Sequence, residues 1–186
     1  MLALLLLTLP ALWLVYKIIP FDNKYRVKQG NHRFKPMIVG LDFRKHWKLA
    51  VSFDPSCKYD IGQDQTDINK IFGVGYISWD AIKWCIKNRK PLHHYNSWRI
   101  GWHYDGYRIQ LMYYCYVKGQ RRSGNINKAN IFELKEINVE LWHKAVNFGD
   151  TTIVCDFKGI PFKLGGYFGG NRTAPHGMEY YFKVKT

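Results

Sequence analysis

The sequence predicts an all-β protein: an antiparallel β-sandwich or jelly roll with one or two short helices, preceded by an N-terminal hydrophobic helix. Three observations favour this fold class. Apolar side chains recur with a period of two from Tyr25 onward. Glycine-rich turns separate the short runs at roughly 8–12 residue spacing. The 186 residues, 47% of them hydrophobic and 17% aromatic, suffice for one core and one appendage.

Residues 2–16 form the most apolar tract, LALLLLTLPALWLVY, in which only Thr8 and Pro10 are not apolar. Counted through Ile19, a helix here would reach ~27 Å, about the thickness of a bilayer core. No basic segment precedes the tract and no small-x-small cleavage site follows it, which favours an uncleaved anchor. A divergent signal peptide and a buried helix are the alternatives.

The chain therefore divides into residues 1–22, an anchor or signal segment, and residues 23–186, the sandwich domain. Residues 1–19 predict contact with a membrane and a membrane-associated location. Basic residues after the tract would place the domain on the cytoplasmic side by the positive-inside rule. The same lysines and arginines fit an exposed strand, so the side of the membrane stays open.

Two strand regions carry the strongest alternation. HWKLAVSF, residues 46–53, places Trp47, Leu49, Val51 and Phe53 on one face. Asp105-Gly106 separates two further alternating runs and suggests a type I′ hairpin turn. With that turn, Trp102 would pair with Ile109. The predicted core face of this hairpin consists of Trp98, Ile100, Trp102, Ile109 and Leu111. The opposite face consists of Arg99, Gly101, His103, Arg108, Gln110, Met112, Tyr114 and Tyr116.

Further strands are expected at IFELKEI, VELWHKAV, TTIVCDF, IPFKL and MEYYFKVK. DINKIFG and DAIKWCIKN are each expected to form a short helix, capped by Asp67 and Asp80 respectively.

The formal charge of +14 favours an anionic partner: nucleic acid, an anionic membrane or an acidic glycan. Nucleic acid is disfavoured because no RNA-binding motif appears and the basic residues are scattered. Neither a phosphate-binding GxGxxG nor an HExxH motif occurs, and the four cysteines lack CxxC spacing, so no cofactor or metal is expected. The cysteines fit either redox compartment.

Catalysis is not predicted, although the sequence leaves the question open. Several histidines offer a general base and Tyr95 or Tyr181 a proton donor. No GxSxG elbow occurs, and the paired carboxylates of glycosidases are missing near the aromatic strands. We expect no catalytic residues.

Binding is better supported by the polar face of the hairpin. Arg99, Gln110, Tyr114 and Tyr116 combine flat rings, a guanidinium and an amide, which suits a glycan. Tyr167 and Asn171 in the glycine-rich segment 165–177 are predicted to assist. Two structural alternatives remain: a second sheet covers the face, and the glycines only let the backbone pass close to the sheet.

Several blocks resemble a family of small, uncharacterised β-sandwich proteins of bacteria and their phages. The resemblance rests on FDPSCKYD, QTDINKIFG, HHYNSWRIGW, RIQLMYYCYVKGQR and GGYFGGNRTAPHGMEYYFKVK, with the patterns HHxNSxRxGW and YFGGxxxAPH. It implies a concanavalin-like jelly roll, often exported or membrane-associated, with a role in carbohydrate recognition and no catalytic residues to transfer. The segment GVGYISWDAIKWCIKNRKPL departs from the pattern.

Jelly-roll polysaccharide lyases offer an enzyme comparison, since they pair QIH with YFKAGxYxQ. This chain lacks QIH and retains only YFK near its end. We therefore expect a membrane-tethered or exported protein that binds a glycan, anionic glycans included. The alternatives are a phage or envelope structural protein that contacts an unknown protein partner, and a lyase-like enzyme.

Overall fold

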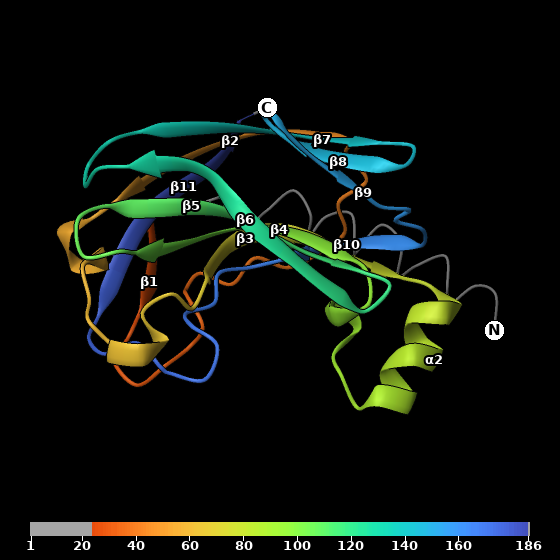
Figure 1. Cartoon of the computed structure of the whole chain (residues 1–186), viewed down its shortest axis with the longest axis horizontal. Helices are drawn as coiled ribbons and strands as arrows, with labels where there is room; N and C mark the ends of the chain where they lie inside the picture. Colours follow the sequence, from red (N-terminus) through yellow and green to blue (C-terminus); the bar gives the residue numbers. More distant parts are fainter. Residues whose placement is uncertain (1–23, 186) are drawn as a thin grey trace, which may run out of the picture.

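The computed structural model describes residues 24–185 as two antiparallel sheets that pack face to face (Figure 1). The tract at residues 1–19, with its predicted anchor helix, lies outside these residues. Within residues 24–185, no helix is long and apolar enough to cross a bilayer.

The six-stranded sheet runs in the order β1-β11-β2-β7-β8-β9. Its strands are β1 (Lys24–Val27), β11 (Met178–Lys185), β2 (His46–Phe53), β7 (Lys135–Trp142), β8 (Ala145–Phe148) and β9 (Thr151–Val154). The five-stranded sheet runs β10-β3-β4-β5-β6. Its strands are β10 (Ile160–Leu164), β3 (Asn69–Ile77), β4 (Ser97–Tyr104), β5 (Ile109–Val117) and β6 (Gln120–Ala129). The predicted antiparallel sandwich is confirmed.

The core lies between the sheets and is aromatic. All four apolar residues predicted for β2 are at most 2% exposed, and the five predicted for the β4–β5 hairpin at most 1%. Trp47 of one sheet meets Trp98 of the other with ring centroids 4.7 Å apart. Burying rings of this size accounts for much of the hydrophobic stabilisation of a sandwich.

The register of the β4–β5 hairpin differs from the prediction by two residues. Trp102 pairs with Leu111 rather than Ile109, and Tyr104 pairs with Ile109. The turn is a longer loop, because the Asp105 carboxylate accepts hydrogen bonds from the amides of Tyr107 and Arg108, both 2.9 Å, and removes Arg108 from the strand. A shift of two keeps every side chain on its face, so the predicted core face is correct although the pairing is wrong.

The structure contains one of the two predicted helices. DINKIFG is no helix: β3 begins at Asn69 and is buried along almost its whole length between β10 and β4. A strand buried on both faces reads as a continuous apolar run, which does not distinguish it from a helix. The second predicted helix exists as α2 (Trp79–Asn88), but its N-cap is Ser78, whose hydroxyl accepts from the amide of Ala81. Asp80 lies in the first turn instead.

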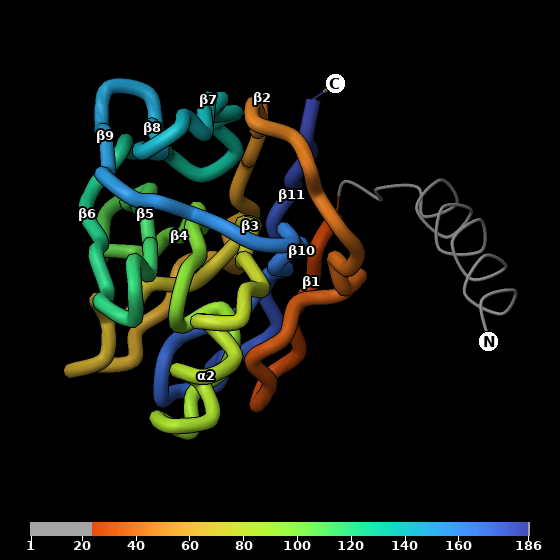
Figure 2. Tube along the Cα trace, turned by 90° about the vertical axis from the view of Figure 1, so that its right-hand side faces the viewer, coloured from red at the N-terminus to blue at the C-terminus, as the bar shows by residue number. Residues whose placement is uncertain are grey.

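Three 3-10 turns complete the described elements: η1 (Pro55–Cys57), η2 (Gly62–Asp64) and η3 (Leu92–His94). Figures 1 and 2 place α2 beside the five-stranded sheet, on the side away from the six-stranded sheet. All four cysteines are free thiols, and Cys57, Cys115 and Cys155 are buried.

Candidate functional site

The outer face of the five-stranded sheet carries the polar residues of interest. Register places Arg99 between Gly73 of β3 and Tyr114 of β5, and Lys70 beside Gly101. The six-stranded sheet covers the opposite face, so this face is not the sandwich core. The predicted alternative, a second sheet over the hairpin's polar face, is not what the structure shows.

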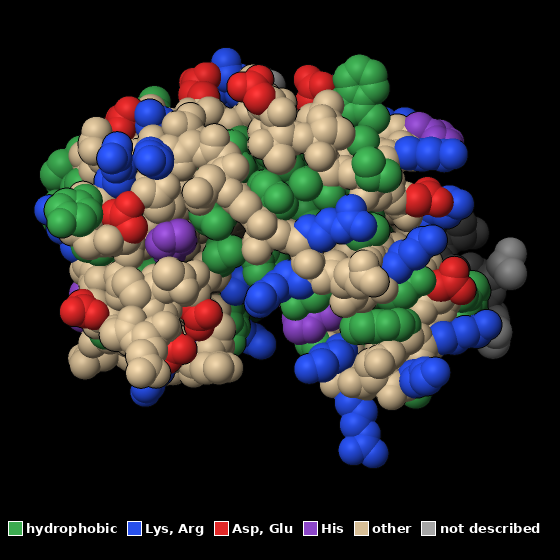
Figure 3. Space-filling model, viewed as in Figure 1, with side chains coloured by type: hydrophobic (Ala, Val, Ile, Leu, Met, Phe, Trp, Pro, Cys, Tyr) green, Lys and Arg blue, Asp and Glu red, His purple; other side chains and the backbone are tan. Residues whose placement is uncertain are grey.

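Two lobes flank this face and leave a hollow between them, which we call the cleft. Figure 3 shows the hollow at the lower edge, with Lys, Arg and His side chains at its border. One lobe contains the glycine-rich segment, where the backbone of Tyr167 pairs with that of Lys70 through bonds of 2.7 and 2.9 Å. The other lobe contains α2 and η3, where the ring of His94 stacks on Tyr116 with centroids 4.5 Å apart.

Arg99 lies on the floor of the cleft and is 7% exposed. Its stem crosses Gly73, where an added Cβ would lie 2.6 Å from Arg99 Cγ, so the glycine makes room for it. The guanidinium donates to the carbonyl of Gly165, while Nε is buried without a hydrogen-bond partner among residues 24–185. Burial lowers the pKa of Arg99 to about 10.

Lys70 lies close by and is 9% exposed. Its Nζ donates to the carbonyl of Gly169 at 3.2 Å and lies 4.8 Å from the ring centroid of Tyr114 and 6.0 Å from that of Tyr167. Burial, and then the charge of Arg99, lowers the pKa of Lys70 to about 8. Within the described chain, neither Lys70 nor Arg99 forms an ion pair with a carboxylate.

The sequence did not indicate Lys70, because its segment was predicted to be helical. The available signal was one lysine within the long apolar run INKIFGVGYI. A register shift between Lys70 and Phe72 interrupts the ladder here. Such bulges redirect a side chain, and this one places Lys70 beside the tyrosines.

Aromatic and imidazole groups form the rest of the cleft. The hydroxyls of Tyr114 and Tyr116 lie 3.2 Å apart, and burial raises the pKa of Tyr116. His93, next to His94 in η3, has its pKa lowered to about 3, first by burial and then by the charge of Arg99. The His93 imidazole is therefore neutral near pH 7, which leaves Lys70 and Arg99 as the buried charges of the cleft.

Four of the six predicted ligand-binding residues come together in the cleft: Arg99, Tyr114, Tyr116 and Tyr167. Gln110 does not, because it lies four residues from Tyr114 along β5, about 13 Å away at the usual strand rise. It is buried and donates to the carboxylate of Asp105. Asn171 is exposed in the glycine-rich segment 165–177. An ion pair of 2.9 Å between the neighbouring Arg172 and Asp64 fixes the position of this loop.

The glycine-rich segment also passes close to its neighbours, as the structural alternative predicted. A Cβ at Gly166 would lie 2.4 Å from the Tyr180 hydroxyl, and one at Gly170 would lie 2.8 Å from the Asp67 carboxylate. Tyr167 stacks on His32 with centroids 4.8 Å apart. The glycines therefore allow a tight path that presents Tyr167 to the cleft.

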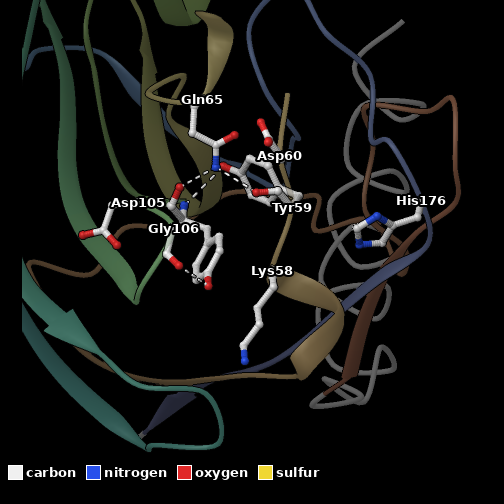
Figure 4. Close-up of a pocket in the computed structure, with 8 residues that line it drawn as sticks. Lys58, Tyr59, Asp60, Gln65, Asp105, Gly106 and His176 are labelled. Carbon is white, nitrogen blue, oxygen red and sulfur yellow. Dashed lines mark hydrogen bonds between the residues drawn. The ribbon is translucent and has the colours of Figure 1, made fainter. Parts of the chain in front are cut away.

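A second depression, of about 610 Å³, opens near the β4–β5 loop (Figure 4). Its polar groups hold the loops to one another: Gln65 donates to the carbonyls of Tyr59 at 2.9 Å and Tyr104 at 2.6 Å. The Tyr104 hydroxyl donates to the carbonyl of Gly106 at 2.6 Å. Since these hydrogen-bonding groups already have partners, the cleft is the stronger candidate. Among residues 24–185, no group of three or more His, Cys, Asp or Glu side chains is placed to hold a metal.

Comparison with solved structures identifies the fold. Alginate lyase AlyC3 matches with a TM-score of 0.53 at 12% identity, over 87% of this chain and 73% of that one. The sandwich is similar in fold to an alginate lyase. The same lyase in complex with dimannuronate matches equally, with 12% identity over 87% of this chain and 72% of that one. A functionally unknown protein from Saccharomyces cerevisiae matches with a TM-score of 0.46 at 6% identity, over 90% of this chain and 91% of that one. No family model and no curated protein matches the sequence.

Proposed function

We propose that the domain binds an anionic glycan in the cleft. The observation that carries the proposal is the pair of buried cations, Lys70 and Arg99, without a carboxylate partner among the described residues. Burying an unpaired charge costs several kcal/mol, so such groups are usually paired or functional. The acid groups of a bound glycan would supply the missing negative charge.

The tyrosines complete the binding surface. Sugar rings pack against aromatic faces, and the rings of Tyr114 and Tyr167 lie beside Lys70, with the hydroxyl of Tyr116 next to that of Tyr114. The fold supports the proposal, since a lyase of similar fold has a solved structure in complex with dimannuronate, an acidic disaccharide. In this arrangement the cations attract the acid groups and the rings orient the sugars.

The binding test measures the affinity of the full chain for polymannuronate and for a neutral glycan by titration calorimetry. Arg99→Gln and Lys70→Met should each weaken binding of the anionic polymer about tenfold or more, since a hydrogen bond to a charged group contributes ~1.5–3 kcal/mol. Lys128→Gln, an exposed substitution at the far end of β6, is the matched control and should bind like the parent. Equal affinity for all variants would exclude the cleft as the site.

The membrane tether forms a separate part of the proposal. We propose that residues 1–19 hold the protein in a membrane without cleavage, because the tract is long, apolar and lacks a cleavage site. The full-length protein should then appear in the membrane fraction at its unprocessed mass. A mature N-terminus beyond residue 19 would contradict the tether and leave the cleft proposal intact.

A lyase activity is the second candidate, and the neutral imidazole of His93 favours it. Elimination from a uronate needs cations near the carboxylate, a neutral base and a proton donor. Arg99, His93 and Tyr116 provide these chemical types in one cleft. Incubation with polymannuronate distinguishes the two functions, because elimination creates an unsaturated sugar with new ultraviolet absorbance, whereas binding alone does not.

A further inference from the structure

One end of the sandwich exposes large apolar side chains that the core does not use. Trp79 and Ile86 of α2 are each 76% exposed, Phe43 is 71% exposed and Ile160 is 53% exposed. Trp79 and Ile86 are seven residues apart, which places them on the same face of the helix. We call this group, with the cations described below, the α2 end.

Strand pairing brings these residues together from three segments. Ile160 pairs with Ile77, which lies two residues before Trp79. Leu41 bridges to Phe162, and the amide of Asp42 donates to the carbonyl of Pro161 at 3.3 Å, so this segment runs antiparallel to β10. That path brings Phe43 to the start of β10, beside Ile160. The apolar residues therefore form one surface rather than isolated positions.

Cations surround this surface. The five basic residues in α2, directly after it and before β10 are all exposed: Lys83, Lys87, Arg89, Lys90 and Lys158. Lys158 interacts with two carboxylates. It forms an ion pair of 2.9 Å with Asp156, and the negative charge of Asp80 also attracts it. Figure 3 shows that Lys and Arg gather on the side of the molecule that carries α2.

We propose that the α2 end docks on an anionic lipid surface. Tryptophan and aliphatic side chains enter the interfacial region of a bilayer, and surrounding lysines bind anionic headgroups. Two copies of this end would repel each other through their like charges, which disfavours self-association. Nucleic acid would use the cations and a stacking ring but would leave Ile86 and Ile160 in contact with water.

This docking is independent of the tract at residues 1–19 and of the glycan proposal. Because α2 forms part of one lobe of the cleft, docking would hold the cleft opening close to the lipid headgroups. A ligand in the cleft would then lie near the membrane surface.

Hydrogen exchange of the full chain tests the proposal, because it locates contact even when another segment also holds the protein. The probes are vesicles of phosphatidylcholine with and without phosphatidylserine. We expect exchange in peptides that cover residues 79–90 and 158–160 to slow about fivefold or more with the anionic vesicles only, and the effect to weaken at high salt.

Two matched variants locate the charge. Lys83→Glu with Lys87→Glu should abolish the protection, whereas Arg108→Glu with Lys128→Glu, at the opposite end of the sandwich, should retain it. Circular dichroism checks that both variants are folded. Equal protection on phosphatidylcholine alone, no protection on either vesicle, or protection without vesicles that grows with protein concentration would each overturn the proposal, the last in favour of a second copy.

Discussion

The Lys70 ammonium lies 4.8 Å from the ring centroid of Tyr114, on the floor of the cleft, and forms no ion pair with a carboxylate of the described chain. A cation over an aromatic face gains ~0.5–2 kcal/mol, which offsets only part of the cost of burial. The remaining cost explains why the pKa of Lys70 is lowered to about 8. The charge of this lysine is thus within reach of mild changes in pH.

Binding of an anionic glycan should weaken as the pH rises above neutrality. The free protein loses the Lys70 proton around pH 8, and a neutral amine attracts no acid group. Calorimetric titrations from pH 6.5 to 9.5, at constant ionic strength, measure this effect. The expected loss between these limits is about tenfold in the parent and much smaller in Lys70→Met. The same pH slope in both proteins would show that another group is responsible.

Lys70→Met should raise the free energy of unfolding while it weakens binding. The pKa of Lys70 falls from 10.5 unfolded to about 8 folded, which corresponds to a cost of about 3 kcal/mol while the lysine is charged in both states. Loss of the Gly169 hydrogen bond and the Tyr114 contact reduces the expected gain to ~1–2 kcal/mol. Urea unfolding at pH 7, with exposed Lys128→Met as control, measures the difference.

The stability difference between Lys70→Met and the parent depends on pH, and its sign follows from the binding of the Lys70 proton. Between about pH 8 and 10.5 the unfolded chain binds the Lys70 proton and the folded protein does not, so the penalty declines as the pH rises. The stability advantage of Lys70→Met should therefore be fully present below pH 8 and shrink toward pH 10. A variant that is less stable than the parent at pH 7 would mean that Lys70 has a net structural role.

Trp102→Ala should cost about 3–5 kcal/mol, and His103→Ala should have little effect. Trp102 is fully buried and meets Phe53 and Tyr59 at ring-centroid distances of 5.0 and 5.8 Å. His103 is half-buried on the opposite face, and its Nδ1 has no hydrogen-bond partner in the part of the chain that the structure describes. Denaturant unfolding of the two variants, which differ by one position along β4, compares the faces directly. Similar losses would show that the polar face also contributes to the core.

The sequence predicted which face of a strand a side chain occupies better than it predicted how the strands pair. Alternation encodes the face of a side chain, so the core of β2 and of the hairpin was predicted correctly. Pairing depends on the loop, and the Asp105 carboxylate shifted it by two residues. Alternation likewise placed the site residues on one face without giving the distances between them. Arg99, Tyr114 and Tyr116 lie on the same face and close to one another, whereas Gln110 lies on that face but farther along β5.

Other features depend on tertiary contacts that no local pattern reports. β3 is buried on both faces, which removed its alternation and concealed Lys70. Ser78 rather than Asp80 caps α2 because β3 continues to Ile77, and the helix can begin only after it. The position of Tyr167 depends on backbone pairing with Lys70, almost a hundred residues earlier in the chain.

Gly73→Ala should disturb both stability and binding, because this glycine accommodates the Arg99 stem. An added Cβ would lie 2.1 Å from the carbonyl oxygen of Trp98 and 2.6 Å from Arg99 Cγ, so β4 or the arginine must move. Crowding of this kind costs ~1–3 kcal/mol, and a displaced guanidinium would reduce affinity for polymannuronate about as much as Arg99→Gln does. Gly177→Ala is the matched control, since its Cβ would meet only the carbonyl of Val27 at 3.8 Å. Urea unfolding and calorimetry of both variants separate the two effects. If Gly73→Ala keeps the affinity of the parent, the path of the Arg99 stem over Gly73 does not determine binding.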